Sequence, residues 1–426
     1  MTDKRTDGRL KNRREFPFNR QQKPTVNPTK RGMAKRQEEL EANSDKGVDE
    51  VSITDDVRGA DYYHGLIPKL DAEPLLKKDG DFLLRKTEIQ QNTVLAVSVR
   101  VDTTVKHFMV NQDDQDRFYF EGQKEKGVAD LIAWHLQTKN PLSTASGARL
   151  KRPIERAPWA LNHDSISLVK KLGEGAFGEV YLAEYAIGRT KQEVAVKTMR
   201  NEATREARLK FMKEARLMRK YNHRNVVKII GVAVHEHPLM LVMEICPGGS
   251  LAGYLRKNKG KLDATDKLRF CLEAADGIGY LASKLCIHRD IAARNCLLSP
   301  KHEVKIADFG MSDEKAIIQD DTLEKVPVKW LAPETLQEKL YSLKTDVWSY
   351  GILVWEIYAD GAEPYPGLTR LQTRAKIVVQ NYRMDMPKDC PKGIANIVMA
   401  AWDKEPNKRP EMTKIARQLR DMTKKA

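Results

Sequence analysis

Five short motifs occur in a fixed order between residues 173 and 334 of this 426-residue chain, and they constrain its fold more than any other feature. The first places Gly173, Gly175 and Gly178 in "GEGAFGEV". Glycine lacks a Cβ, so backbone N–H groups in such a loop can approach phosphate oxygens closely. A G-x-G-x-x-G pattern also begins dinucleotide-binding folds, but there a helix follows directly. Here "EVYLAEY" alternates like a strand, which favours a glycine-rich hairpin over a nucleotide.

The other motifs supply charged residues. "EVAVKTM" predicts a strand that carries Lys197, and the next helical segment offers Glu214 as its partner. "HRDIAARN" contains Asp290 and Asn295, and "DFG" contains Asp308. The lysine suits the α- and β-phosphates, Asn295 and Asp308 suit magnesium, and Asp290 is placed to accept a hydroxyl proton. Each residue alone would more often be structural, but their common order argues against chance.

In this order the motifs resemble a protein kinase over residues 166–421, with no catalytic position missing. The resemblance implies a bilobal domain that binds ATP and Mg2+. It also implies that Met243 is the gatekeeper and that Glu244 to Cys246 form the hinge to adenine. The positions expected to bind the nucleotide are Leu172, Gly173, Gly175, Gly178, Val180, Ala195, Lys197, Met243, Glu244, Cys246 and Leu297.

Two features resemble tyrosine kinases rather than serine/threonine kinases. Arg294 lies four residues after the catalytic aspartate, and Ala292 stands where serine/threonine kinases usually have a lysine. "VPVKWLAPE" resembles the platform on which a substrate tyrosine packs. The resemblance therefore implies that Asp290, Arg294, Lys197 and Glu214 form the catalytic set and that protein tyrosines are the substrates. It further implies two structural supports, a pair between Glu334 and Arg409 and a brace from Asp346 to the catalytic loop.

Residues 61–155 have a different pattern. The runs "GDFLLRKTE", "TVLAVSVRV", "VKHFMVNQ" and "RFYFEG" predict an antiparallel sheet. One helix is predicted in "LDAEPLLKKDG", although Pro74 is tolerable only within its first turn. A second helix is predicted by residues that share one face, namely Val128, Leu131, Ile132, His135 and Leu136. The predicted fold class is α+β, with this unit joined by a linker at 156–165 to the bilobal domain.

"YYHGLIPKLDAEPLL" and "GDFLLRKTE" resemble the Src homology 2 domain, which binds phosphotyrosine. Arg85 matches its buried arginine, whose planar fork grips phosphate bidentately. Arg85 also falls within an apolar run, where an unpaired charge would be costly. The resemblance assigns the rest of the pocket to Lys69, Lys86, Thr87 and His107. Tyr62, in place of the usual tryptophan, and Pro74 depart from the family pattern.

The domain order and the wording of "WALNHDSISL" and "DFGMS" resemble the Fes/Fer group of non-receptor tyrosine kinases. Full-length members carry an F-BAR and coiled-coil region that this chain does not show, so curvature sensing is not implied. The expectation is a tyrosine kinase that its phosphotyrosine-binding domain targets to partner proteins. An inactive adaptor and a kinase of different specificity remain as alternatives. The intact catalytic residues argue against the first, and Arg294 and "PVKW" argue against the second.

The charge is unevenly distributed in the first 60 residues, which are basic over 1–36 and acidic over 37–60, where two Lys and Arg stand against eight Asp and Glu. The formal net charge is +15, and residues 1–36 hold twelve Lys and Arg against three Asp and Glu. Residues 1–60 show no hydrophobic periodicity and are predicted to be a disordered tail. The tail is either a solvated leader or a weak contact for anionic membranes or nucleic acid.

Five cysteines without a C-x-x-C pair indicate a reducing compartment. Apolar runs such as "GILVWEIYA" are too short to span a bilayer. A cytoplasmic protein is therefore expected, with membrane or nuclear association left open by the tail.

The segment from Asp308 to Glu334 contains no tyrosine, although related kinases are usually switched on by a phosphotyrosine there. Arg289 of "HRD" would hold that phosphate, and a second arginine of the family is replaced by Asp313. We therefore expect Asp320 or its neighbour Asp321 to pair with Arg289. Alternatives are that both acids are merely solvated, or that Thr322 is phosphorylated by another kinase.

Overall fold

The computed structural model describes the chain except for residues 1–55, 90–91, 176–177, 200–203, 322–325 and 425–426. Thr54–Ala426 form one compact unit. Most of the predicted tail lies outside the described residues. Residues 56–60 were also assigned to the tail, but they belong to the folded unit, because Val57 is fully buried and the Asp56 carboxylate accepts a hydrogen bond from the amide of Ala129.

The N-terminal unit contains the predicted antiparallel sheet. Its strand order is β3-β2-β1-β7, with only β7 parallel to its neighbour β1. A small second sheet, β4-β5-β6, precedes helix α3. The elements are β1 (Asp81–Ile89), β2 (Asn92–Val101), β3 (Thr104–Met109), β4 (Asn111–Gln112), β5 (Phe118–Tyr119), β6 (Lys124–Glu125), α3 (Val128–Thr138) and β7 (Arg152–Pro153). The predicted face of α3 is confirmed, because Val128, Leu131, Ile132 and His135 are buried.

The helix predicted in residues 70–80 is much shorter than expected. Helix α2 (Lys69–Ala72) ends before Pro74, which lies in the 3-10 turn η1 (Glu73–Leu75). Proline has no amide hydrogen to donate to the preceding turn of an α-helix and its ring clashes there. The prediction had allowed Pro74 within the first turn of a longer helix, but the chain leaves the α conformation instead.

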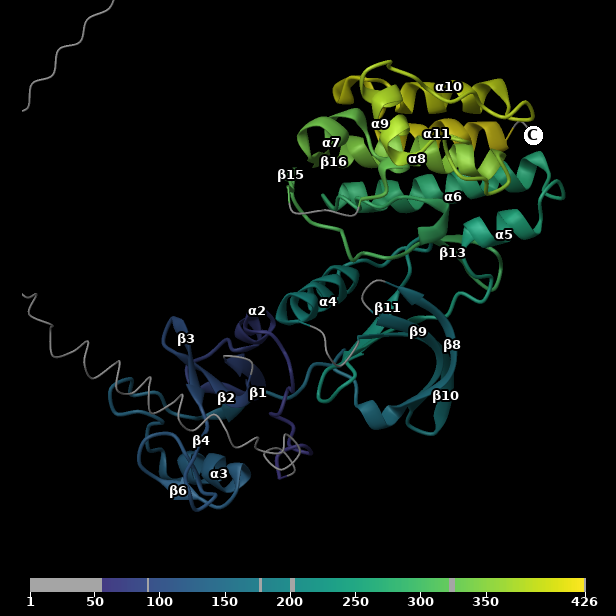
Figure 1. The fold of residues 1–426 in the computed structure, drawn as a ribbon. Coiled ribbons are helices and arrows are strands. Elements are labelled where there is room, and N and C mark those ends of the chain that lie inside the picture. Colours follow the sequence, from purple (N-terminus) through teal and green to yellow (C-terminus); the bar gives the residue numbers. More distant parts are fainter. Residues whose placement is uncertain (1–55, 90–91, 176–177, 200–203, 322–325, 425–426) are drawn as a thin grey trace, which may run out of the picture. The chain divides into compact units, whose positions relative to one another are not determined.

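The next lobe, here called the small lobe, is a five-stranded antiparallel sheet with one helix (Figure 1). Its strand order is β11-β12-β10-β9-β8. The elements are η2 (His163–Ser165), β8 (Ile166–Gly175), β9 (Gly178–Ile187), β10 (Thr190–Met199), α4 (Arg205–Met218), β11 (Ile229–Ala233) and β12 (Met240–Glu244). The strand predicted directly after the glycines is β9, so the hairpin interpretation of the glycine pattern is confirmed.

The large lobe is mainly helical (Figure 1). Its helices are α5 (Leu251–Lys257), α6 (Ala264–Ser283), α7 (Pro333–Glu338), α8 (Leu343–Tyr358), α9 (Arg370–Val378), α10 (Lys392–Ala401) and α11 (Met412–Thr423). Short pieces complete it: η3 (Ala293–Asn295), β13 (Cys296–Leu298), β14 (Val304–Ile306), β15 (Ile317–Gln319), η4 (Val328–Trp330), β16 (Leu340–Ser342) and η5 (Pro406–Lys408).

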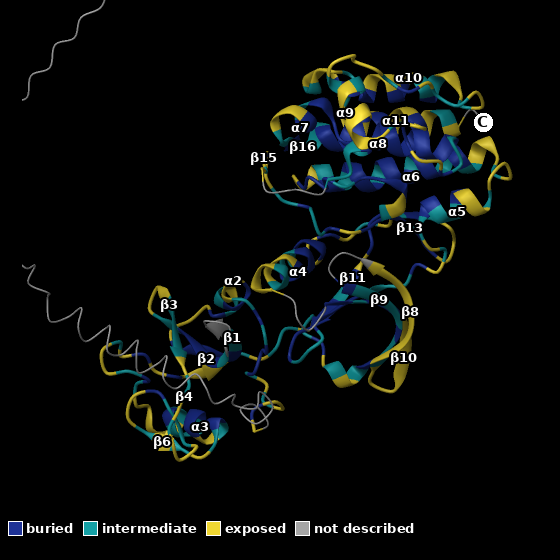
Figure 2. Cartoon of the chain, viewed as in Figure 1, coloured by how far each residue is buried: buried dark blue, intermediate teal, exposed yellow. Residues whose placement is uncertain are grey.

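Helix α8 forms the centre of the large lobe. Every residue from Thr345 to Tyr358 is buried, and the helix is dark blue in Figure 2. A helix that is apolar on all sides belongs inside a core. No helix in the described part of the chain is long and apolar enough to cross a membrane.

Candidate active site

Lys197 is held between two carboxylates. Its Nζ lies 2.8 Å from Oε1 and 2.9 Å from Oε2 of Glu214, and 3.5 Å from Oδ1 of Asp308. Strand β10 supplies the lysine and helix α4 supplies the glutamate, so the predicted ion pair is present and joins sheet to helix. Burial disfavours the ammonium, but the two carboxylates outweigh burial and raise the pKa of Lys197. The lysine is therefore a fixed positive charge, itself mostly buried, beside the exposed Asp308.

The Asp290 carboxylate is oriented by two residues of its own loop. Asn295 Nδ2 donates to Asp290 Oδ2 at 2.7 Å and to the Asp290 main-chain oxygen at 2.8 Å, and Arg294 Nη2 donates to Asp290 Oδ1. Because the Asn295 side-chain nitrogen donates to Asp290, the side-chain oxygen of Asn295 is the atom suited to a metal ion. Of the predicted catalytic and metal-binding residues, this loop brings together Asp290, Arg294 and Asn295.

The same loop is anchored from the core of the large lobe. Asp346 on α8 accepts hydrogen bonds from the main-chain amides of His288 and Arg289, at 2.7 and 2.9 Å. Burial raises the pKa of Asp346 to about 7. The predicted brace is present, and so is the Glu334–Arg409 pair, whose atoms are 2.7 and 2.8 Å apart.

Glu356, also on α8, is a support that sequence reasoning missed. Its Oε2 accepts hydrogen bonds from the Trp330 indole at 3.0 Å and from the Ala293 amide at 2.9 Å. The guanidinium of Arg294 lies 4.5 Å from the Trp330 ring centre, in cation–π geometry. Glu356 therefore ties the "PVKW" segment to the catalytic loop. The sequence feature that could have identified Glu356 is its position as the single acid inside the apolar run "GILVWEIYA". A charge buried in such a run needs hydrogen-bond partners.

Most of the residues predicted to bind the nucleotide lie on the strands of the small-lobe sheet. Ala195 pairs with Met243 between β10 and β12, and Val180 pairs with Gly173 between β9 and β8. Leu297 lies on β13, across an isolated bridge from Ser250. Cys246 follows β12, and burial raises the pKa of its thiol to about 12, with the charge of Glu244 adding to the effect.

The glycines of the hairpin differ in what they require. A Cβ at Gly178 would lie 1.8 Å from the main-chain oxygen of Thr198, so only glycine fits beside strand β10. A Cβ at Gly173 would meet nothing within 4 Å. Thus Gly178 is needed for the fold itself, whereas the space at Gly173 is consistent with a ligand over the hairpin.

The segment after "DFG" contacts Arg289 as expected. Arg289 Nη2 donates to Asp320 Oδ2 at 2.7 Å, and the guanidinium lies 4.1 Å from the ring centre of Tyr341. The main chain just before Asp320 is fixed, because β15 pairs with β16 and the Asp320 amide donates to the Lys339 main-chain oxygen at 3.2 Å. Asp321 is exposed, so of the two candidate acids Asp320 makes the contact. Asp313 pairs instead with Lys213 of α4, at 2.8 Å.

The predicted phosphate pocket is built around Arg85, which is 5% exposed on β1. Arg85 Nε donates to Ser98 Oγ at 3.0 Å, and Ser98 Oγ lies 2.8 Å from His107 Nδ1. His107 Nε2 is 3.2 Å from Glu73 Oε1, and Lys69 Nζ is 3.5 Å from the same atom. Sequence reasoning missed Ser98 and Glu73. Lys86 and Thr87 are half-buried near the end of β1.

The N-terminal unit also contacts helix α4 directly. Arg216 of α4 forms a bidentate pair with Asp71 of α2, with Nε–Oδ1 and Nη2–Oδ2 distances of 2.6 and 2.7 Å. The Leu66 amide donates to the Val234 main-chain oxygen at 2.7 Å. Arg219 lies 3.6 Å from the ring centre of Trp159 in the linker. The helix that carries Glu214 therefore has partners in both the N-terminal unit and the linker.

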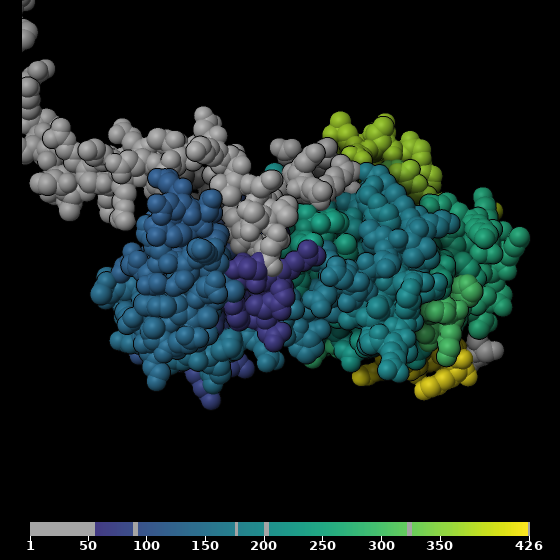
Figure 3. Space-filling view, turned by 90° about the horizontal axis from the view of Figure 1, so that it is seen from below, coloured from purple at the N-terminus to yellow at the C-terminus, as the bar shows by residue number. Residues whose placement is uncertain are grey.

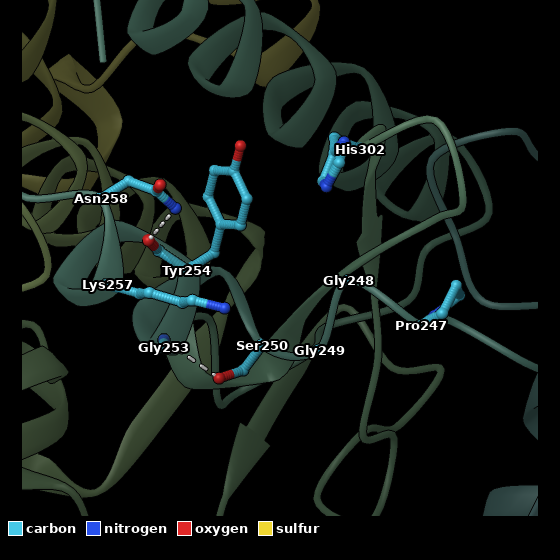
Figure 4. Close-up of a pocket in the computed structure, with 9 residues that line it drawn as sticks. All are labelled: Pro247, Gly248, Gly249, Ser250, Gly253, Tyr254, Lys257, Asn258 and His302. Atoms are coloured by element: carbon cyan, nitrogen blue, oxygen red, sulfur yellow. Dashed lines mark hydrogen bonds between the residues drawn. The ribbon is translucent and has the colours of Figure 1, made fainter. Parts of the chain in front are cut away.

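Two pockets lie away from the catalytic residues. One, of about 470 Å3, is lined by Arg58, Gly59, Arg156, Asn162, His163, Asp164, His235 and Glu236. Arg58, in the purple start of the described chain (Figure 3), pairs there with Glu236. The other, of about 390 Å3, follows the predicted hinge (Figure 4) and is lined by Pro247, Gly248, Gly249, Ser250, Gly253, Tyr254, Lys257, Asn258 and His302. Its Asn258 amide donates to the Tyr254 main-chain oxygen at 2.9 Å.

Comparisons with known proteins agree with this geometry. The family "Protein tyrosine and serine/threonine kinase" matches residues 166–419, and the SH2 domain family matches residues 62–135. The chain is 62% identical to Fer-related kinase 1 of Caenorhabditis elegans, over 87% of this chain and 96% of that protein.

Two further relatives are longer than the matched region. Identity to tyrosine-protein kinase Fer of Rattus norvegicus is 40%, over 86% of this chain and 44% of that protein. Identity to the transforming protein Fps of an avian sarcoma virus is 38%, over 84% of this chain and 67% of that protein. The chain thus spans less than half the length of Fer and nearly all of the nematode relative.

Proposed function

Since the chain belongs to the protein tyrosine and serine/threonine kinases, in the group with an SH2 domain that includes Fer and Fps, we propose that it transfers the γ-phosphoryl group of ATP to protein tyrosines. The observation that carries the proposal is the pair of Lys197 and Glu214 beside Asp308, together with an oriented Asp290. A lysine fixed by a helix glutamate and an aspartate beside it are what phosphoryl transfer requires.

Each residue has a distinct role in this proposal. Lys197 binds the α- and β-phosphates, and Glu214 keeps the ammonium in place. Asn295 and Asp308 offer oxygen atoms to a magnesium ion, which usually takes few ligands from the protein and the rest from phosphates and water. Asp290 accepts the proton of the substrate hydroxyl, and Arg294 and Asn295 hold its carboxylate ready.

The preference for tyrosine is supported by the segment around Trp330. Its ring is fixed by the hydrogen bond to Glu356 and by Arg294, so the segment offers a rigid platform beside Asp290. A long tyrosine side chain can rest on such a platform and still reach the catalytic carboxylate. The alternative, a pseudokinase adaptor, would not require the pairs that orient Lys197 and Asp290.

The SH2 domain binds phosphotyrosine proteins in this proposal. The buried guanidinium of Arg85, with Lys69 and His107 nearby, suits a doubly charged phosphate. We expect a cytoplasmic protein; all five cysteines are free, as in a reducing compartment. Contact of the basic tail with membranes or nucleic acid stays a prediction, because the tail lies outside the described residues.

We further propose that Asp320 takes the place of the activation-loop phosphotyrosine. The carboxylate meets the same arginine that holds the phosphate in related kinases, and it needs no modification. A carboxylate carries about one charge and a phosphate nearly two, so the loop should be held less firmly.

One assay tests the catalytic proposal. The purified chain, with ATP and Mg2+, is given a poly-Glu-Tyr polymer or a matched polymer with serine in place of tyrosine, and Lys197→Met serves as the blank. We expect phosphate transfer to the tyrosine polymer alone. Asp290→Asn should lower kcat by about a hundredfold or more while nucleotide affinity stays near wild type, because a proton acceptor is lost. Activity equal to the blank would favour the adaptor, and activity of Asp290→Asn within tenfold of wild type would reject the assigned base.

A further inference from the structure

An acidic side chain lies inside the pocket that the SH2 domain would use for phosphate. Glu73 Oε1 is 3.2 Å from His107 Nε2 and 3.5 Å from Lys69 Nζ. The pKa of Glu73 is lowered, since the contacts with His107 and Lys69 outweigh its burial. The carboxylate is therefore ionised, and it lies beside Lys69 and His107, which a bound phosphate would contact.

The hydrogen bonds around Glu73 form a continuous chain. Arg85 Nε–H donates to Ser98 Oγ, so the serine hydroxyl is free to donate to Nδ1 of neutral His107. His107 then carries its proton on Nε2 and donates it to Glu73. In this chain Arg85 Nε–H, the Ser98 hydroxyl and His107 Nε2–H each donate one hydrogen bond. The carboxylate thus fixes the orientation of His107 and offsets part of the positive charge of Arg85 and Lys69 without any ligand.

The local fold explains how an acid comes to this place. Pro74 ends α2 after only four residues and forces Glu73 into the 3-10 turn η1. Pro74 departs from the SH2 family pattern, and by ending α2 it places Glu73 at the pocket. The Glu73 side chain is 34% exposed, so it can swing into solvent without disturbing the core.

We propose that Glu73 is an intramolecular competitor of phosphotyrosine in this pocket. The inference rests on the proposed phosphotyrosine binding by the SH2 domain. In the free protein the carboxylate offsets the charge of Lys69 and accepts the hydrogen bond of His107. A phosphate, with a charge of nearly two, displaces it and must also overcome repulsion from it. Glu73 thereby lowers the affinity for every phosphotyrosine ligand and favours the dianionic form over singly charged ligands.

The test compares affinities in the full chain. Binding of a fluorescein-labelled, degenerate phosphotyrosine peptide library is followed by anisotropy for wild type and Glu73→Gln. Glutamine keeps the size and can still accept from His107, so the fold should be retained, which a melting curve checks. We expect the variant to bind about twofold to fivefold more tightly, the range for removing one partly exposed charge.

Two controls separate the possible outcomes. Asp114→Asn removes an exposed acid outside the pocket, and it matches the change in net charge. Arg85→Leu should abolish binding. If wild type and Arg85→Leu bind equally poorly, phosphotyrosine binding itself is rejected. If wild type binds but Glu73→Gln binds no more tightly than Asp114→Asn, or binds more weakly, Glu73 is a support for Lys69 and His107, and the competitor role is overturned.

Discussion

Glu356 shows how a single buried acid connects parts of the active site that are distant in sequence. It lies on α8 and is 5% exposed. Its carboxylate accepts hydrogen bonds from both the Trp330 indole and the Ala293 amide. Burial raises its pKa from 4.5 to about 7, although both hydrogen bonds favour the ionised form. Ionisation of Glu356 in the folded protein is therefore unfavourable.

We expect a pH-dependent stability from this residue. Between the unfolded pKa of 4.5 and the folded value of about 7, the folded state binds more protons, so the Glu356 contribution to stability falls as pH rises. The total effect is of the order of 3 kcal/mol. The melting temperature of Glu356→Gln relative to wild type should therefore increase from pH 5 to pH 8.

The matched control for this change is Glu338→Gln, which alters an exposed acid on α7. Its melting temperature relative to wild type should not vary over the same pH range. A constant difference between Glu356→Gln and wild type would mean that Glu356 is ionised at pH 5 in the folded protein.

Residues with a proposed role in chemistry were the easiest to find in the sequence. Lys197, Asp290 and Asp308 stand in short motifs, where local spacing identifies them. Glu356, Ser98 and Glu73 act through contacts made by other elements of the fold. No local pattern specifies the neighbour 26 residues away that receives the Trp330 hydrogen bond. Such partners follow from tertiary packing, which a motif does not encode.

At the scale of elements, the strand pair β15–β16 presents Asp320 to Arg289. Arg289 is 7% exposed and its guanidinium packs on Tyr341, so an unpaired charge there would be costly. The pairing with an aspartate was foreseen from the missing tyrosine. Whether Asp320 or Asp321 would pair with Arg289 depended on the register of the short strand β15 against β16.

Asp320→Asn should lower kcat several-fold, because the amide cannot balance the charge of Arg289 and the loop loses its anchor. Asp321→Asn, an exposed neighbour, should stay close to wild type. Both are measured with the tyrosine polymer before and after phosphatase treatment. If phosphatase silences the wild type, the loop is switched by a phosphate, and Thr322, outside the described residues, becomes the first site to examine.

Helix α2 was the element predicted least well. The sequence 70–80 has the apolar residues of a helix, but Pro74 ends it after Ala72. Strands β1, β2 and β3 of the same unit were predicted correctly, because alternating β-branched residues indicate one face of a sheet. The run "RFYFEG" was expected in that sheet, but it supplies only β5 of the separate β4-β5-β6 sheet. A proline near a helix start can be accommodated or can end the helix, and local sequence does not decide between the two outcomes.

At the scale of the whole molecule, the contact between Asp71 and Arg216 joins the SH2 domain to the helix that positions Lys197 through Glu214. Asp71 is almost fully buried and the pair is bidentate. Coupling between the two domains therefore has a direct route, and binding events at one domain can alter the other if the helix has two positions.

Asp71→Ala should lower kcat several-fold, since Arg216 loses its partner and α4 is held less firmly. Deletion of residues 61–155 should lower it at least as much. The charge exchange Asp71→Arg with Arg216→Asp should recover part of the loss, and Asp79→Ala, which removes an acid paired with Lys151, is the control. A deleted chain as active as the full chain would show that the SH2 domain only targets the enzyme.

The buried thiol at the predicted hinge bears on the design of irreversible inhibitors. Cys246 follows the strand that carries Met243 and Glu244. An acrylamide inhibitor that binds at the predicted adenine site would therefore place its electrophile near this thiol. Alkylation proceeds through the thiolate, and a pKa of about 12 leaves almost none of it at neutral pH. Electrophiles directed at this cysteine should therefore label it slowly, and selective compounds for this enzyme would have to rely on reversible fit.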